Sequence, residues 1–300
     1  GVIWMFIAFS LFIPFIDYIV PGDPTNPENI PIHLSMFHTV FNITNVLLLI
    51  WFVPQIATIV KKMIKPSESE KDEDEYKLEY FSTGVQPIPE IAIIEAKKEV
   101  IKMSNMVTGM VTLFNETFKN KKAISNDLSK ARKIELKSDQ MQEQISTYLA
   151  DCTKHELSLQ SSTNAAVMTR ITNELESIGD STLNLFIQID RITDNNLKFN
   201  DKMNKEILKI YSIVFEFIEW NNSFISDNIK PMSEKNLNKS INYEKEIDDI
   251  RNKLLDSSRA RLSSDGSDPK AELLFMDIIK HLEHIGDYSL NISQALEQIS

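Results

Sequence analysis

Apolar residues form two long runs near the start of the chain. The first run covers residues 2–20, with Asp17 as its only charged residue. A helix rises ~1.5 Å per residue, so a run of this length can cross a bilayer core of ~30 Å. The second run covers residues 36–59 and carries His38, Asn42 and Asn45 in its first half. The pattern predicts two transmembrane helices, the second with a polar stripe.

The charges beside these runs predict their orientation. Lys61, Lys62 and Lys65 follow the second run directly, whereas the loop between the two runs is acidic and contains neither Lys nor Arg. Basic residues next to membrane spans stay on the cytoplasmic side, so we expect the C-terminal part in the cytoplasm. Asp17 lies near the end of its run, which favours a position at the membrane interface over a role in transport.

A helical pattern begins after a charged linker. Residues 66–88 show no sustained period, which is typical of a solvated segment. From Pro89 onward, apolar residues recur at helical spacing, and short breaks between long helices favour an antiparallel bundle. The predicted helices cover residues 90–120, 124–152, 158–195, 201–228, 232–262 and 269–299. The sequence therefore predicts an all-α protein with three parts, namely membrane segments (1–65), a linker (66–88) and a helical domain (89–300).

Composition supports this fold class and excludes one class of partner. The 300 residues include only 7 glycines, too few for the many tight turns of an all-β chain. The formal net charge of −11 repels a nucleic-acid backbone, so we expect no nucleic-acid partner. The single cysteine, Cys152, can form no intramolecular disulfide. The chain starts at Gly1 within an apolar run, and we expect it to be part of a longer protein.

The helical domain contains an internal repeat. The segment Glu176 to Asp180 (ESIGD) returns as Glu283 to Asp287 (EHIGD), each in the last helix of a three-helix unit, and the units cover about 89–196 and 200–300. The middle helix of each unit carries a further Glu-x-x-x-Asp pair. The paired acidic residues are Glu135 with Asp139, Glu176 with Asp180, Glu244 with Asp248, and Glu283 with Asp287.

The spacing of these pairs predicts metal-binding clusters. Residues i and i+4 of a helix lie on one face, so each pair presents its oxygens in one direction. If the middle and last helices of a unit face each other, four carboxylates converge, and an all-oxygen set suits hard cations. The alternative is a solvated acidic surface without a bound ion. Gly179 and Gly286 are predicted to allow close helix approach, and His281 and His284 are predicted to lie at the surface.

The two E-x-I-G-D-x-x-x-N segments resemble the signature of the PhoU family. The segment His33 to Trp51 (HLSMFHTVFNITNVLLLIW) resembles the last membrane segments of bacterial sodium/phosphate cotransporters, many of which end in a PhoU-like domain. The start of the helical domain, from Pro89 to Met103, is similar to the start of that domain. The sequence departs from the usual motif, with Ser177 and His284 where Arg is common, and Ser181 and Tyr288 where His is common.

The resemblance implies two three-helix bundles and a role in restraining phosphate uptake at the bacterial plasma membrane. It implies two multinuclear metal clusters, one held by Glu135, Asp139, Glu176 and Asp180 and the other by Glu244, Asp248, Glu283 and Asp287. Iron is the expected metal, with Zn, Mn or Mg as alternatives, and the expected partners are the membrane, sodium, phosphate and a second copy of the chain. We expect no catalytic residue, because the repeat helices lack the Glu-x-x-His pairs of di-iron enzymes. The alternative function is a membrane-tethered signalling or metal-binding protein without transport activity.

Overall fold

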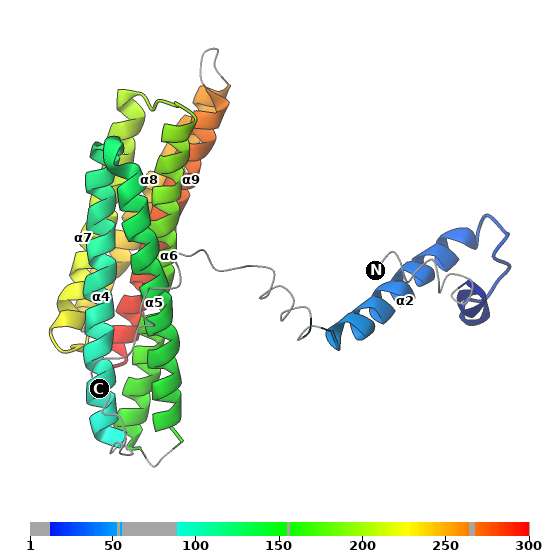
Figure 1. Cartoon of the computed structure of the whole chain (residues 1–300), viewed down its shortest axis with the longest axis horizontal. Coiled ribbons are helices and arrows are strands. Elements are labelled where there is room, and N and C mark those ends of the chain that lie inside the picture. Colours follow the sequence, from blue (N-terminus) through cyan, green and yellow to red (C-terminus); the bar gives the residue numbers. More distant parts are fainter. Residues whose placement is uncertain (1–12, 53–54, 56–88, 155–156, 264–267, 300) are drawn as a thin grey trace. The chain divides into compact units, whose positions relative to one another are not determined.

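The computed structural model describes residues 13–52, 55, 89–154, 157–263 and 268–299. These residues are helical or form turns and loops, and none of them lies in a β-strand. The chain divides into two compact units, Gly1–Asp74 and Glu75–Ser300. Each unit is described by itself, with the helix labels of Figure 1. The all-helical fold expected from the sequence is thus confirmed for the described part of the chain.

The first unit contains a helical segment over residues 13–19 and the helix α2, Ile30–Ile50. The turn between them is stabilised by Asp23, whose carboxylate accepts hydrogen bonds from the backbone and hydroxyl of Thr25. Gly22 has a φ of +110°, a conformation that glycine adopts without strain.

No helix among the described residues is both long enough and apolar enough to cross a membrane. The first predicted span, 2–20, lies mostly outside those residues, and so does the second from residue 53 onward, apart from Gln55. The helix starts earlier than predicted, because α2 begins at Ile30, six residues before Met36, and includes His33 and Ser35. The described helices therefore give the prediction of membrane spans no support.

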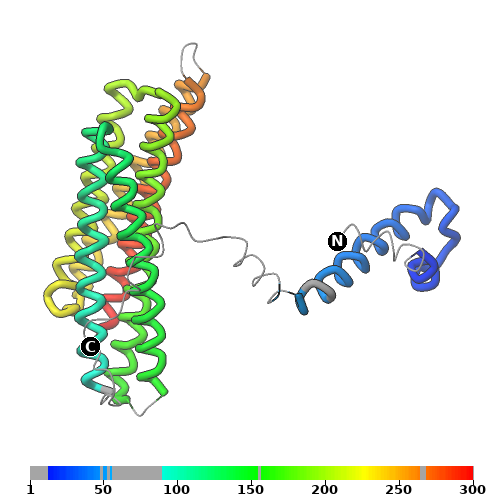
Figure 2. The backbone as a smooth tube through the Cα atoms, viewed as in Figure 1, coloured from blue at the N-terminus to red at the C-terminus, as the bar shows by residue number. Residues whose placement is uncertain are grey.

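The second unit is a bundle of six long helices (Figure 1). Figure 2 allows the chain to be followed from α4 in cyan to α9 in orange and red. The helices are α4 (Pro89–Lys119), α5 (Ile124–Cys152), α6 (Leu159–Asp194), α7 (Asp201–Ser226), α8 (Glu234–Leu262) and α9 (Pro269–Glu297), with a short 3-10 helix, η2 (Lys121–Ala123), before α5. These bounds lie within about three residues of those predicted from periodicity.

Local sequence explains where these helices begin. Ser158, Asn200 and Asp268 each precede a helix and accept a hydrogen bond from a backbone N–H of its first turn. Such caps satisfy donors that have no partner within the helix, and each typically contributes about 1 kcal/mol. Asn196, just after α6, has a φ of 53°, the left-handed conformation in which a helix often ends.

The last helices of the two halves, α6 and α9, pack against each other. Arg170 of α6 donates a hydrogen bond to Gln294 of α9 at 3.1 Å, and Asn291 of α9 donates one to Glu174 of α6 at 3.1 Å. Residue numbers rise along α6 as their partners fall along α9, so the two helices run antiparallel. The same register brings Gly179 and Gly286 to the same level of the bundle. The repeated motifs therefore lie in the middle of the domain.

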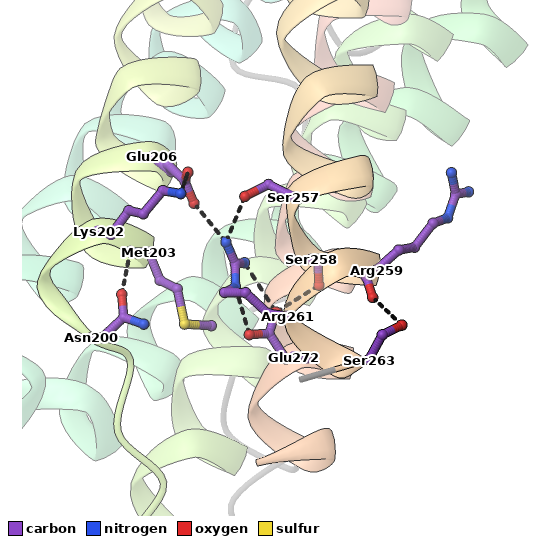
Figure 3. A network of polar contacts seen from close by, with 10 residues as sticks. All are labelled: Asn200, Lys202, Met203, Glu206, Ser257, Ser258, Arg259, Arg261, Ser263 and Glu272. Carbon is purple, nitrogen blue, oxygen red and sulfur yellow. Dashed lines mark hydrogen bonds and ion pairs between the residues drawn. The ribbon is translucent and has the colours of Figure 1, made fainter. Parts of the chain in front are cut away.

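A buried polar network joins α7, α8 and α9 (Figure 3). Glu272 is 3% exposed and receives two hydrogen bonds from Arg261, at 2.6 and 3.0 Å, and one from Ser258 at 2.6 Å. Arg261 also contacts Glu206 of α7 at 3.4 Å. Because a buried carboxylate is tolerated only when it is well paired, this network fixes how the three helices of the second half fit together.

Candidate metal sites on the paired helices

The first acidic cluster consists of Glu135 and Asp139 on α5 with Glu176 and Asp180 on α6. Burial raises the pKa of Glu135, and the charges of Asp139, Asp180 and Glu176 raise it further. Burial also raises the pKa of Glu176, and the charge of Asp139 across the two helices raises it further. The four carboxylates thus act on one another electrostatically, but no three of them offer ligand atoms within 4.8 Å of one another. Arg132 is the only basic group that opposes the shift of Glu135 among the described residues.

The glycines of the repeat let the paired helices approach each other. A Cβ atom added at Gly179 would lie 3.4 Å from Oγ of Ser138 on α5. A Cβ added at Gly286 would lie 2.9 Å from Cδ1 of Ile247 on α8, closer than side chains tolerate. The predicted packing role is thus supported for Gly286, whereas a Cβ at Gly179 would make an ordinary van der Waals contact. Oγ of Ser138 is buried without a hydrogen-bond partner among the described residues, and it lies beside Asp139 in sequence.

The second acidic cluster consists of Glu244 and Asp248 on α8 with Glu283 and Asp287 on α9. Burial raises the pKa of Asp287 to about 6, and the charges of Glu283, Asp248 and Glu244 add to the effect. Burial likewise raises the pKa of Glu244, with contributions from Asp248 and Glu283. The charges of these four carboxylates thus act on one another, and their role as a ligand set stays a prediction.

An arginine distinguishes the second cluster from the first. The Arg251 guanidinium lies 2.9 Å from Asp248 on its own helix and 2.6 Å from Glu283 on α9. The position three residues after Asp139 in the first cluster is the neutral Gln142, which donates a hydrogen bond to Asn173 instead. Arg251 thus links the paired helices of the second half, and the equivalent position of the first half holds no arginine.

The two histidines of α9 lie at the edge of the surface. His281 and His284 are both partly exposed, and the side chain of His284 is 37% exposed, so the predicted surface position agrees in part with the structure. One ligand atom of each of Glu283, His284 and Asp287 lies within 4.8 Å of the other two. His284 is therefore a candidate ligand that sequence reasoning missed. The sequence feature that could have indicated this ligand is the spacing of three residues between His284 and Asp287, which places both side chains on one helix face.

Tyr288 of α9 lies between the two clusters. Burial raises the pKa of Tyr288, a hydrogen bond with Ser181 of α6 opposes the shift, and the charges of Asp180 and Asp287 increase it. Asp180 belongs to the first cluster and Asp287 to the second, so both clusters border the α6–α9 contact.

Comparison with known proteins identifies the family of this domain. The family profile described as "PhoU domain" matches residues 100–186 and 223–296, more than half of the chain. The chain belongs to the PhoU domain family. The two matched segments end within α6 and α9, the helices that carry the repeated acidic motif. A search of curated proteins found no match.

A solved structure supports the PhoU fold. The crystal structure of PhoU from Pseudomonas aeruginosa is similar, with a TM-score of 0.62 and 16% sequence identity. The similarity covers 69% of this chain and 96% of that chain. The predicted PhoU-like fold is confirmed. Nothing in these comparisons concerns a sodium/phosphate cotransporter, and the metal ligands stay a prediction.

The two clusters of this PhoU domain differ in their donor groups. The first cluster offers carboxylate oxygens, which suit a hard cation, and Arg132 acts on one of them, Glu135. In the second cluster, Arg251 already binds the carboxylates that link α8 to α9. The group of Glu283, His284 and Asp287 includes an imidazole, which suits a transition metal, and it is the one group among the described residues whose ligand atoms lie within 4.8 Å of one another. The four-carboxylate ligand sets implied by the resemblance stay a prediction in both halves.

Proposed function

We propose that this chain is the C-terminal part of a bacterial sodium-dependent phosphate transporter, in which the PhoU domain restrains phosphate uptake. The observation that carries the proposal is the PhoU domain itself, matched in sequence and in fold. The family resemblance links such a domain to the control of phosphate homeostasis. The segment before it resembles the membrane segments of these transporters, as described above. The proposed location is the plasma membrane, with the PhoU domain in the cytoplasm.

The surface of the first unit supports an apolar environment for α2. Val46, Leu47 and Ile50 are more than half exposed, and Trp51 just after the helix is 79% exposed. Apolar side chains clustered on one surface indicate a contact with a membrane or with another protein. The missing contact would be the lipid or the remaining membrane helices of the transporter.

The acidic clusters provide the proposed regulatory input. A metal ion bound by Glu135, Asp139, Glu176 and Asp180 would neutralise their mutual repulsion and tie α5 to α6. The expected metal is iron, with Mn, Mg or Zn as alternatives. Loss of the ion would favour a looser arrangement of the two helices, and a transporter that contacts the two arrangements differently would change its activity. This role is regulatory rather than enzymatic.

A second candidate function is a membrane-tethered signalling or metal-binding protein without transport activity. One observation favours it, namely that Glu283, His284 and Asp287 offer ligand atoms within 4.8 Å of one another, and such a group can bind a metal whether or not the protein transports phosphate. The two candidates differ in whether the chain affects phosphate movement directly.

Uptake of labelled phosphate in cells distinguishes these functions. Cells would carry the full-length protein or a version that lacks residues 67–300, and uptake would be measured with and without sodium after growth in high or low phosphate. We expect faster sodium-dependent uptake from the truncated protein in high phosphate, because the restraint is removed. A matched variant, Glu135→Gln with Glu176→Gln, should give the same release with the domain intact. Equal uptake and equal response to phosphate in all versions would contradict the proposal.

A further inference from the structure

A basic pocket lies at the turn between α4 and α5. Its volume is about 490 Å³, and the polar side chains that line it are Lys119, Asn120, Lys121, Lys122 and Asn204. Asn204 comes from the first turn of α7, so the pocket joins parts of the chain that are far apart in sequence. The first acidic cluster is separate, because Glu135 lies eleven residues into α5, or ~16 Å along the helix.

The three lysines of this pocket lack acidic partners. Two neighbouring lysines are paired, since Lys130 lies 3.0 Å from Asp127 and Lys202 lies 3.9 Å from Glu206. In the described part of the chain, no carboxylate lies within ion-pair distance of the pocket lysines, and none lines the pocket. A chain with a net charge of −11 has many carboxylates to spare, so three uncompensated ammonium groups at one hollow are unusual for it.

Lys121 is held in place although its charge is not neutralised. Its side chain is partly buried, and Nζ lies 5.2 Å from the ring centroids of both Phe118 and Phe199. Burial lowers the pKa of Lys121. Contacts with two aromatic faces favour the ammonium form and restrict its position. A desolvated and positioned cation is ready to bind an anion without a large cost in side-chain ordering.

We propose that this pocket binds a small phosphate-bearing anion. Ammonium groups bind phosphate as point charges, and three of them match a group that carries two or more negative charges. The amides of Asn120 and Asn204 add neutral donors for the remaining phosphate oxygens. The phosphate comes either from a free compound or from the headgroup of an anionic phospholipid. The site depends neither on the acidic clusters nor on the proposed transport function.

Binding measurements on the full chain test this proposal. Inorganic pyrophosphate and ATP serve as free probes in calorimetry, and vesicles of phosphatidylglycerol or of phosphatidylcholine serve as lipid probes in co-sedimentation. We expect saturable binding to at least one phosphate-bearing probe, weakened about tenfold or more by Lys121→Gln with Lys122→Gln, a loss of at least about 1.4 kcal/mol. Binding to free probes identifies a soluble ligand, and binding to phosphatidylglycerol vesicles alone identifies a lipid headgroup.

A matched control separates the pocket from overall charge. Lys154→Gln with Lys230→Gln removes the same charge from exposed lysines that pair with Asp151 and Asp227, outside the pocket. Lys122→Glu alone provides a second test if the Lys121 substitution disturbs folding, because Lys122 is exposed and makes no aromatic contact that fixes it. The proposal is overturned if no phosphate-bearing probe binds, or if the control pair weakens binding as much as the pocket pair.

Discussion

Alanine substitutions at three helical glycines should have opposite effects on stability. In Gly286→Ala, the new Cβ would lie 2.9 Å from Cδ1 and 3.3 Å from Cγ2 of Ile247, which is itself only 1% exposed. Overpacking of this kind costs about 1–3 kcal/mol, whereas alanine gains about 1 kcal/mol over glycine in helix propensity. We therefore expect Gly286→Ala to destabilise the domain by about 1 kcal/mol.

The other two glycines serve as matched controls for this expectation. In Gly179→Ala the new Cβ would lie 3.4 Å from Oγ of Ser138, at the short end of ordinary van der Waals contact, so part of the propensity gain is offset. A Cβ atom added at Gly109 would have no neighbouring atom within 4 Å outside its own helical backbone. Gly109→Ala should therefore stabilise the domain by about 0.5–1 kcal/mol. The expected order of stability is Gly109→Ala, then Gly179→Ala, then Gly286→Ala.

Urea unfolding followed by circular dichroism measures this order. The full chain would be used in the presence of a chelator, so that metal binding does not contribute to stability. The midpoint should shift without a change in the m-value if only the native packing is altered. If Gly286→Ala proved as stable as Gly109→Ala, α8 and α9 could not be as close at this level as the structure has them. The geometry inferred for the second cluster would then be wrong.

Three further predictions concern the charged groups. Arg251→Gln should increase the affinity of the second cluster for Mn²⁺ or Zn²⁺ in calorimetry and destabilise the metal-free protein by about 1 kcal/mol, whereas Gln142→Arg should weaken binding at the first cluster. Unchanged metal affinity in both variants would contradict the assigned role of the arginine. Burial and neighbouring carboxylates raise the pKa of Asp287 to about 6. Without metal, the stability that its protonation provides should therefore be lost as the pH rises from about 4 through 6. Asp287→Asn should flatten the dependence of domain stability on pH in this range. Burial alone would raise the pKa of Glu272, but hydrogen bonds from Arg261 and Ser258 outweigh burial and lower it. The stability that the ionised Glu272 contributes should therefore be present above about pH 4.3 and be lost as the pH falls below that value. Glu272→Gln should destabilise the domain at pH 7 by about 2–4 kcal/mol in thermal unfolding, and an unchanged profile of stability against pH would show that the network is dispensable.

The sequence predicted those features of the domain that depend on local pattern. Helical periodicity and breaks such as Asn195-Asn196 gave the helix bounds, because caps and turn residues act over a few positions. The repeat of Glu176 and Asp180 as Glu283 and Asp287 located the two helices that carry the glycines, and Gly286 does have a close neighbour on α8. That the middle and last helices face each other was a condition of the sequence argument, and the structure pairs α5 with α6 and α8 with α9.

Features that depend on the register between distant helices were not predictable. Arg251 follows Asp248 by three residues, but its contact with Glu283 depends on how far α8 slides along α9. His284 was assigned to the surface because its helix face was judged without knowledge of α6. The basic pocket needs Asn204, which no local pattern connects with Lys121.

The membrane prediction took an apolar run as the bounds of a helix. The described helix α2 starts at Ile30, before that run, and includes His33, which is buried and lies 3.8 Å from Asp17. The start of a helix and a contact between residues sixteen positions apart cannot be read from an apolar run alone.

The antiparallel contact between α6 and α9 has a consequence for cooperativity. Each of these helices is covered on one side by its own half and on the other by its counterpart, so neither half has a complete core when the other is absent. The two halves are thus one cooperative folding unit that shares the α6–α9 contact. A change that moves the acidic residues of α6 or α9 in one half therefore shifts this contact and alters the packing of the other half directly.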